Sequence, residues 1–183
     1  MITLVTGGAR SGKSGYAEQL AVQSGLAVVY LATAQARDAE MSQRIQRHRA
    51  LRPGGWLTVE EPLALGTALR AQARADRCIV IDCLTLWLTN LILADHPEHC
   101  DVVSIDAGRR YSAERTDFLD ALRMEPGEVI VVSNEVGTGV VPLGALNRFF
   151  VDEAGRLNQA VAACARRVVW MVAGCPVYAK GSA

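Results

Sequence analysis

The sequence has no excess of charge of either sign. It carries 19 Lys and Arg residues against 19 Asp and Glu residues, so its formal net charge at pH 7 is zero. Proteins that bind nucleic acids or anionic membranes through their overall field carry a clear basic excess. The balance therefore argues against general nucleic-acid or membrane-surface binding and leaves only local basic patches open.

Long apolar runs and paired cysteines are also missing. No apolar stretch is long enough to cross a bilayer, and the chain starts in a strand-like segment rather than a secretory leader. The five cysteines include no C-x-x-C pair, which is untypical of a disulfide framework or a zinc site. We therefore expect a cytoplasmic protein whose cysteines pack as small core residues. They are Cys78, Cys83, Cys100, Cys164 and Cys175.

The chain does contain a regular alternation of apolar runs and helix-type segments. Its 183 residues, half of them hydrophobic, favour one domain spanning residues 1–183. The apolar runs are continuous stretches of Val, Ile and Leu, as in strands buried on both faces of a parallel sheet. An α/β fold with right-handed crossovers is expected. Strands are predicted at 2–6, 27–33, 78–82, 128–133 and 168–172, helices near 13–24, 37–50, 62–75, 84–94, 105–124 and 143–166, and a short edge strand is compatible with 174–180.

A phosphate-binding loop is the first stretch with recognisable chemistry. Residues 4–14 read LVTGGARSGKS, which has the form G-x-x-x-x-G-K-[ST] between a predicted strand and a predicted helix. Glycines let backbone N–H groups approach phosphate oxygens, Lys13 supplies a point charge, and Ser14 supplies a hydroxyl for Mg²⁺. A plain glycine turn at a helix start is the alternative. The pattern predicts a nucleoside triphosphate site formed by Gly7, Gly8, Ala9, Arg10, Ser11, Gly12, Lys13 and Ser14.

An acidic residue closes the apolar strand at 78–82. In nucleotide sites such a residue holds Mg²⁺ or a magnesium-bound water. Many buried strands also end in Asp because Asp caps the next helix. With the phosphate loop upstream, Asp82 becomes the second candidate ligand for Mg²⁺ beside Ser14.

A histidine lies on one face of the predicted helix at 37–50. Met41, Ile45 and His48 are spaced i, i+4 and i+7, which places them on one side of a helix. Cationic neighbours favour an uncharged imidazole, which is a nucleophile toward phosphorus. The alternative is a packed histidine on a solvated helix with i,i+4 ion pairs. The neighbouring arginines are Arg44, Arg47, Arg49 and Arg52, and the helix is followed by a turn at Pro53, Gly54 and Gly55.

Polar residues also follow the predicted strand at 128–133. Ser133, Asn134 and Glu135 come at its carboxyl end, where parallel sheets bind ligands, and Gly137 and Gly139 follow. This favours a site over an ordinary turn. Further along, Gly155 interrupts a helical pattern, and its lack of a side chain suggests close packing.

Together these motifs resemble the bifunctional adenosylcobinamide kinase / adenosylcobinamide-phosphate guanylyltransferase family of cobalamin biosynthesis. The resemblance covers nearly the whole chain and is far more specific than the phosphate loop alone. Its motifs are VTGGARSGKS at 5–14, YLATAQ at 30–35, RIQRHR-x-x-RP at 44–53, Trp56, IDCLTLWLTN at 81–90, SNEVGTGVVP at 133–142 and GRLNQ at 155–159.

The resemblance implies a fold of the P-loop NTPase (RecA-like) type and two linked reactions. ATP or GTP first phosphorylates the hydroxyl of the aminopropanol arm of adenosylcobinamide. GTP then donates GMP through a guanylyl-histidine to adenosylcobinamide phosphate, which gives adenosylcobinamide-GDP and pyrophosphate. It also implies Mg²⁺ as cofactor and a homotrimer.

The guanylylated histidine of the family lies in the segment that matches 44–53, and His48 is the only histidine there. Where the family segment carries two adjacent histidines, this chain has Arg47 at the earlier position. His96 and His99 match no motif. Either Glu60 or Glu61 is hypothesised to accept hydrogen bonds from guanine. With the phosphate loop, the implied nucleotide site comprises Thr33, Ala34, Gln35, Arg52, Pro53, Gly54, Gly55, Glu60, Glu61 and Asp82.

Three points stay open at this level. A regulatory P-loop ATPase or GTPase would carry the same loop but form no covalent intermediate. A small-molecule kinase would lack the transferase step. The general base for the cobinamide hydroxyl is either Asp82 or Glu135.

Overall fold

The computed structural model describes residues 1–36, 38–50, 52–95, 108–124 and 126–182. His96, His99 and Cys100 lie outside the described residues, as do the predicted helix positions 37 and 105–107. The strands are β1 Ile2–Gly7, β2 Ala27–Ala32, β3 Leu57–Glu60, β4 Arg77–Asp82, β5 Glu128–Val132, β6 Arg167–Val172 and β7 Cys175–Lys180. The helices are α1 Lys13–Gln23, α2 Ala39–Ala50, α3 Leu65–Gln72, α4 Leu84–Asp95, α5 Arg109–Met124 and α6 Ala145–Cys164.

The seven strands form one sheet in the order β3-β2-β4-β5-β1-β6-β7. All neighbouring pairs are parallel except β6 and β7, which are antiparallel. The predicted parallel α/β sheet is therefore confirmed, and the tail does add an edge strand. The edge strand β3 was not predicted, because its four residues alternate and are exposed or half-buried rather than forming an apolar run.

The helix predicted at 62–75 is shorter in the structure. One carboxylate oxygen of Glu61 accepts hydrogen bonds from the backbone N–H groups of Leu63 and Ala64, both at 2.8 Å, so these residues form a turn before α3. At the other end, Ala73 has an extended backbone with ψ 126°. The side-chain hydrogen bonds of a turn thus compete with the helix at its start.

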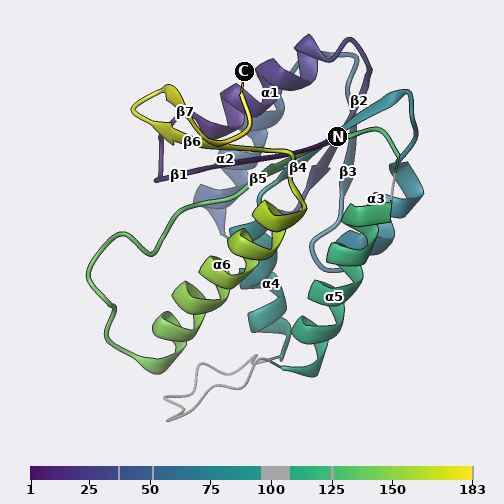
Figure 1. Ribbon diagram of the computed structural model, residues 1–183. Helices are drawn as coiled ribbons and strands as arrows, with labels where there is room; N and C mark the ends of the chain where they lie inside the picture. The colour runs from purple at the N-terminus through teal and green to yellow at the C-terminus, as the bar shows by residue number, and fades with distance from the viewer. Residues whose placement is uncertain (37, 51, 96–107, 125, 183) are drawn as a thin grey trace.

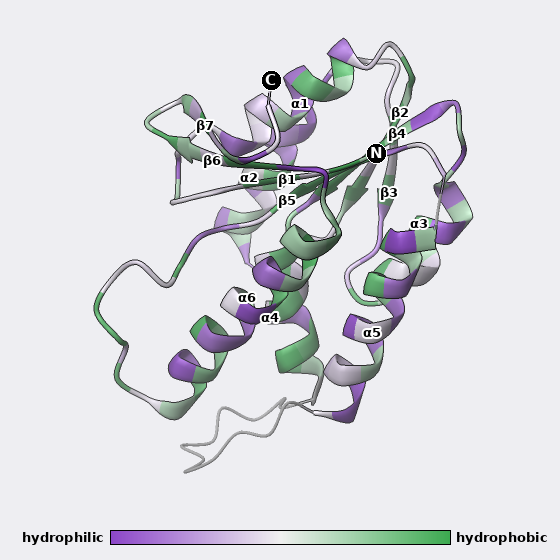
Figure 2. Ribbon diagram, viewed as in Figure 1, coloured by the Kyte–Doolittle hydropathy of each residue, from purple (hydrophilic) through white to green (hydrophobic). Residues whose placement is uncertain are grey.

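Helices cover both faces of the sheet (Figure 1). Helix α1 lies on one face, and α3, α4, α5 and α6 lie on the other. Because strand side chains alternate between faces, Ile79 and Ile81 of β4 pack under the four helices, and Val80 of the same strand packs under α1. Figure 2 shows green, apolar residues along the strands and on the inward sides of the helices. Among the described residues, no helix combines the length and apolar character that a membrane crossing requires.

Parallel register aligns the carboxyl ends of four strands in one row. Asp82 pairs with Ala32 on one side and with Val132 on the other, and Ala32 pairs with Glu60. All four are even-numbered and belong to the face that α1 covers. This row therefore lies at the strand edge where parallel sheets bind ligands.

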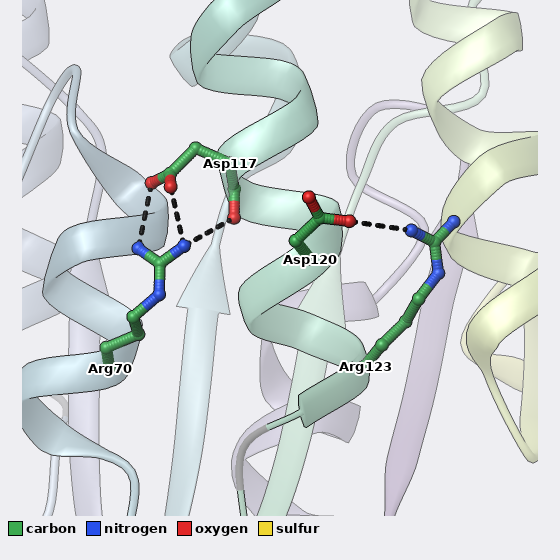
Figure 3. Close-up of polar contacts among 4 residues, drawn as sticks. All are labelled: Arg70, Asp117, Asp120 and Arg123. Carbon is green, nitrogen blue, oxygen red and sulfur yellow. Dashed lines mark hydrogen bonds and ion pairs between the residues drawn. The ribbon is translucent and has the colours of Figure 1, made fainter.

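Helices α3 and α5 approach each other closely beside this sheet. Both terminal nitrogens of the Arg70 guanidinium donate to the Asp117 carboxylate, one of them at 3.0 Å, and Asp120 pairs with Arg123 on the same helix at 3.1 Å (Figure 3). The hydrogen bond from Arg70 holds the pKa of Asp117 below its ordinary value. The side chains are partly exposed, so each pair contributes modestly. The close approach of α3 and α5 depends more on Gly66, because the backbone of Asp117 crosses directly over it.

We predict that Gly66→Ala destabilises the protein. A Cβ on Gly66 would lie 2.8 Å from the carbonyl carbon and oxygen of Asp117, which are backbone atoms that cannot rotate away. Overpacking of this kind costs roughly 1–3 kcal/mol, which urea unfolding would measure. The close packing expected at Gly155 is wrong, because no described atom beyond the adjoining turns of α6 lies within 4 Å of a Cβ added there. Gly155→Ala is therefore the matched control, and alanine is the better helix former. Equal stability of the two variants would contradict this packing argument.

Candidate active site

The loop between β1 and α1 has the backbone of a phosphate cradle. Gly7 and Gly12 have φ values of +149° and +94°, which residues other than glycine rarely adopt. A Cβ at Gly7 would also meet the Ser11 hydroxyl at 2.8 Å. Lys13 is buried, and its ammonium donates to the Gly8 carbonyl at 2.6 Å. The loop thus carries a desolvated cation at the start of a helix, which favours an anion.

A cavity of about 470 Å³ opens between this loop, the strand ends and α2. Residues 7–14 of the phosphate-loop motif contribute six of the lining residues, and α2 contributes four. The cavity therefore joins segments that are distant in the sequence. Its lining residues are Ala9, Arg10, Ser11, Gly12, Lys13, Ser14, Gly15, Tyr30, Ala32, Ala34, Met41, Ile45, His48, Arg49, Arg52, Glu60, Asp82, Cys83, Leu86, Val132 and Asn134.

The histidine and the phosphate loop border the same cavity. Met41, Ile45 and His48 all line it, in agreement with the prediction that they share one face of α2. His48 is half-buried, so its imidazole is accessible from the cavity. Of the arginines expected near His48, Arg49 and Arg52 line the cavity.

Asp82 is fixed by a tyrosine that the sequence reasoning did not single out. The Tyr30 hydroxyl donates to Oδ2 of Asp82 at 2.7 Å. The guanidinium carbon of Arg52 lies 3.5 Å from the centroid of the same ring, and Trp56 stacks on it with centroids 6.4 Å apart. Burial, and then the neighbouring carboxylate of Asp82, raise the pKa of Tyr30 far above its ordinary value. Its hydroxyl is therefore a permanent hydrogen-bond donor. The signal available in the sequence was its place in the YLATAQ motif.

The two candidate guanine-binding carboxylates differ in their surroundings. Glu60 lines the cavity, and its carboxylate forms an ion pair with Arg49, about half of each side chain being exposed. Glu61 does not line it, and one of its oxygens already accepts the two amide hydrogens before α3. Only Glu60 therefore presents its carboxylate to the cavity.

Other predicted residues lie behind the cavity wall. Thr33 is fully buried, and its hydroxyl accepts from the Cys83 N–H at 2.9 Å and donates to the Cys83 carbonyl at 2.8 Å. The buried amide of Asn90 donates to the Thr33 carbonyl at 2.7 Å. This part of the motif thus fixes the backbone next to Asp82. The predicted residues outside the cavity lining are Gly7, Gly8, Thr33, Gln35, Pro53, Gly54, Gly55 and Glu61, of which Gly54 and Gly55 form the expected turn.

The polar residues after β5 divide between two cavities. Asn134 lines the first cavity, and its side-chain amide donates to the Thr85 hydroxyl at 2.7 Å. Glu135 lines a second cavity of about 330 Å³ together with Thr138 and Trp170. Three loop residues, Ala9, Arg10 and Ser11, line both cavities. The loop is thus a partition that both cavities share. In α6, the side-chain amide of Asn158 donates to the Asn134 carbonyl at 3.1 Å, and Arg156 pairs with Glu153.

The oxygen donors of the first cavity fit a magnesium ion. Ser14 and Asp82 both line the first cavity, and both offer oxygen atoms. Among the described residues, no group of three or more His, Cys, Asp and Glu side chains is placed to hold a metal. Mg²⁺ is typically bound through one or two protein oxygens, the remaining positions being taken by water and substrate phosphates. Ser14 and Asp82 match that pattern.

Comparison with known proteins bears on this site. Residues 3–179 match the family model described as cobinamide kinase / cobinamide phosphate guanyltransferase. The chain is 55% identical over 181 residues to the bifunctional adenosylcobalamin biosynthesis protein CobP of Pseudomonas aeruginosa, covering 99% of this chain and 98% of the relative. It is 41% identical over 184 residues to the bifunctional adenosylcobalamin biosynthesis protein CobU of Salmonella typhimurium, covering 98% and 100%.

Two solved structures share the fold at low identity. One is the RadB recombinase, with a TM-score of 0.50, 18% identity, and coverage of 92% of this chain and 73% of that one. The other is an ATPase from a type III secretion system, with a TM-score of 0.54, 12% identity, and coverage of 92% and 50%. They agree with the expected RecA-like P-loop fold.

Cys83 lies in the cavity wall, and we predict that it is not a nucleophile. Burial raises the pKa of both the Cys83 and the Cys78 thiols to about 11. A raised pKa keeps a thiol protonated until the pH approaches that value, so both should react with iodoacetamide at pH 8 roughly 100-fold more slowly than an ordinary free thiol. Alkylation should accelerate as the pH rises toward 11.

Peptide mass spectrometry would measure the rates one cysteine at a time. Exposed Cys175 is the internal reference, and unfolding in guanidinium chloride should remove the difference between the three thiols. Alkylation of Cys83 as fast as that of Cys175 at pH 8 would contradict the prediction and make this thiol a candidate nucleophile.

Proposed function

Since the chain belongs to the cobinamide kinase / cobinamide phosphate guanyltransferase family, we propose that its two reactions share the cavity between the phosphate loop and α2. In the first, a nucleoside triphosphate phosphorylates the hydroxyl on the aminopropanol arm of adenosylcobinamide. In the second, GTP supplies GMP to adenosylcobinamide phosphate, which yields adenosylcobinamide-GDP. These are the two activities that the sequence predicted, and they match those of the family.

The second reaction proceeds through His48. An imidazole nitrogen attacks the α-phosphorus of GTP, a P–N bond forms, the bond to the β-phosphate bridging oxygen breaks, and pyrophosphate leaves. A phosphate oxygen of adenosylcobinamide phosphate then attacks the same phosphorus, and the P–N bond breaks to release the neutral imidazole. Covalent catalysis of this kind divides one transfer between two bulky partners into two steps.

The observation that carries this proposal is the shared cavity. His48 comes from α2 and Lys13 from the phosphate loop, yet both line one space of about 470 Å³. A histidine with only a packing role on α2 would not need to share a cavity with the phosphate loop, as His48 does together with Met41 and Ile45. A regulatory ATPase has no use for a nucleophile there.

The leaving pyrophosphate is stabilised by cations in the same wall. Lys13 is buried at the loop, and Arg10 and Arg52 line the cavity. Fixed cations that meet developing negative charge stabilise the transition state without reorganisation. Ser14 and Asp82 would hold Mg²⁺, which neutralises charge on the phosphate oxygens when bound.

The kinase reaction needs a base for the cobinamide hydroxyl. Asp82 lies in the first cavity and Glu135 in the second, on the two sides of the phosphate loop. Glu135 accepts the Gly137 N–H with one carboxylate oxygen at 2.9 Å. Asp82 lines the shared cavity but is committed to Tyr30 and to the proposed metal, whereas Glu135 lies across the loop from that cavity. Both carboxylates therefore stay candidates for the base.

Guanine recognition is assigned to Glu60. Guanine presents N1–H and an exocyclic amino group as adjacent donors, whereas adenine has an acceptor at N1. A carboxylate that accepts both donors selects guanine. Glu60 is the carboxylate of the two candidates that lines the cavity, and Arg49 balances its charge until the base arrives.

The proposed assembly is a homotrimer. Val140, Val141 and Leu143 precede α6 and are 97%, 73% and 91% exposed. Adjacent apolar side chains with this exposure are typical of a contact surface. A subunit contact there would support the trimer.

We predict that GTP labelled at the α-phosphate labels His48 covalently. With Mg²⁺ and no acceptor, the denatured protein should retain label that is stable to base and labile to acid, as a phosphoramidate is. His48→Ala should carry none. His99→Ala is the control, because His99 matches no motif of the site, and it should be labelled like the wild type.

Label retained in His48→Ala would rule out this nucleophile. If the wild type is not labelled but still phosphorylates adenosylcobinamide, the protein is a kinase without the transferase step. Nucleotide hydrolysis with neither labelling nor phosphorylation would indicate the regulatory ATPase instead.

Glu60→Gln should lower the preference for GTP over ATP in the labelling reaction by roughly 10- to 100-fold, because charge-assisted hydrogen bonds to guanine are lost. Comparing kcat/KM for the two nucleotides would measure it. Arg49→Gln breaks the same ion pair but keeps the carboxylate, so it should preserve the preference. If both substitutions shift the preference equally, the ion pair and not guanine recognition is responsible.

A further inference from the structure

Two oppositely charged side chains of the cavity wall, Asp82 and Arg52, both contact Tyr30. Tyr30 is 2% exposed and points to the α1 side of β2, where its hydroxyl reaches Asp82 at 2.7 Å. The guanidinium carbon of Arg52 lies over its ring, 3.5 Å from the centroid. Tyr30, Asp82 and Arg52 all line the first cavity.

The register of the sheet explains how one side chain reaches both groups. Ala32 is the cross-strand partner of Asp82, and Tyr30 lies two residues earlier on the same face of β2. A phenol has the length to reach diagonally to the end of the neighbouring strand. On its other side, Tyr30 pairs with Thr58 of β3, whose hydroxyl lies 3.4 Å from Nη1 of Arg52.

Asp82 and Arg52 are nevertheless not paired with each other. Within the part of the chain that the structure describes, the ion pairs closer than 4.0 Å do not include these two residues. The buried Nε of Arg52 also has no hydrogen-bond partner among the described residues. Arginine and carboxylate bind each other strongly in a bidentate pair. Such a pair would neutralise both groups and remove them from the nucleotide.

We propose that Tyr30 is a positioning residue that keeps these charges separate, its hydroxyl orienting the Asp82 carboxylate toward Mg²⁺ and its ring holding the Arg52 guanidinium toward the nucleotide phosphates. The inference rests on the proposed nucleotide site. It adds a residue that touches neither phosphorus nor metal but sets the direction of two groups that do. Trp56, whose ring stacks on Tyr30 with the centroids 6.4 Å apart, completes the support.

The two functions of the tyrosine are separable by substitution. Tyr30→Phe keeps the ring and loses the hydroxyl, so Asp82 alone loses its orientation. Tyr30→Leu loses both contacts. Binding of guanosine 5′-[α,β-methylene]triphosphate, whose α,β bond His48 cannot break, is measured by calorimetry with Mg²⁺ and with EDTA.

In Tyr30→Phe, the gain in affinity that Mg²⁺ provides should fall by about tenfold, since a hydrogen bond to a charged group is lost. Its affinity in EDTA should stay within about twofold of the wild type. In Tyr30→Leu, the affinity in EDTA should fall as well, by roughly 3- to 10-fold, because Arg52 loses its cation–π contact.

A double-substitution cycle separates positioning from general damage. If Tyr30 acts through Asp82, Tyr30→Phe should have no further effect on the Mg²⁺-dependent gain in an Asp82→Ala background. Tyr178→Phe is the matched control, because its hydroxyl also forms a 2.7 Å hydrogen bond, to Tyr16. It should leave both affinities unchanged. Circular dichroism and thermal unfolding establish that each variant is folded.

The inference is overturned if Tyr30→Phe keeps the wild-type gain from Mg²⁺, or if it loses the same factor in the Asp82→Ala background. Should Tyr30→Leu not fold, the cycle of Tyr30→Phe with Asp82→Ala decides alone. Failure of the wild-type protein to bind the analogue at all would instead contradict the proposed function. The two failures are therefore distinguishable.

Discussion

The parallel register of β3, β2, β4 and β5 is the constraint on which the site depends. It places Glu60, Ala32, Asp82 and Val132 in one row at the carboxyl ends of the strands. Residues of a row share a face, so the carboxylate proposed for guanine and the one proposed for Mg²⁺ point to the same side of the sheet. A shift of one residue in any strand would move its side chain to the opposite face. The phosphate loop and α2 only close a cavity over this row.

Much of the fold follows from local sequence patterns. The strands of the sheet centre are continuous apolar runs, and their buried environment on both faces requires that composition. The phosphate loop is equally local, because its glycines and Lys13 act within a few residues. Edge strand β3 escaped prediction since only one neighbour, β2, stabilises it and its side chains remain half in water.

The site itself was less predictable wherever it depends on contacts between distant segments. His48 was identified by its motif, but no pattern within α2 indicates that this helix turns its face toward the loop. In the sequence, Tyr30 resembles any other buried strand residue. Its contact with Asp82 arises from the register of β2 and β4, and its contact with Arg52 from the path of the chain between α2 and β3. Glu60 and Glu61 were equivalent in the sequence. They differ only because Glu61 is drawn into the turn before α3.

The covalent step of the proposed mechanism resolves a conflict over the phosphate loop. While GTP is bound, its triphosphate fills the anion site at Lys13 and the start of α1. Adenosylcobinamide phosphate is itself an anion and could not enter the same cradle. Once GMP is attached to His48 and pyrophosphate has left, the loop again offers a buried cation and a helix N-terminus to a phosphate. In the proposed mechanism a single cradle then serves the donor first and the acceptor second.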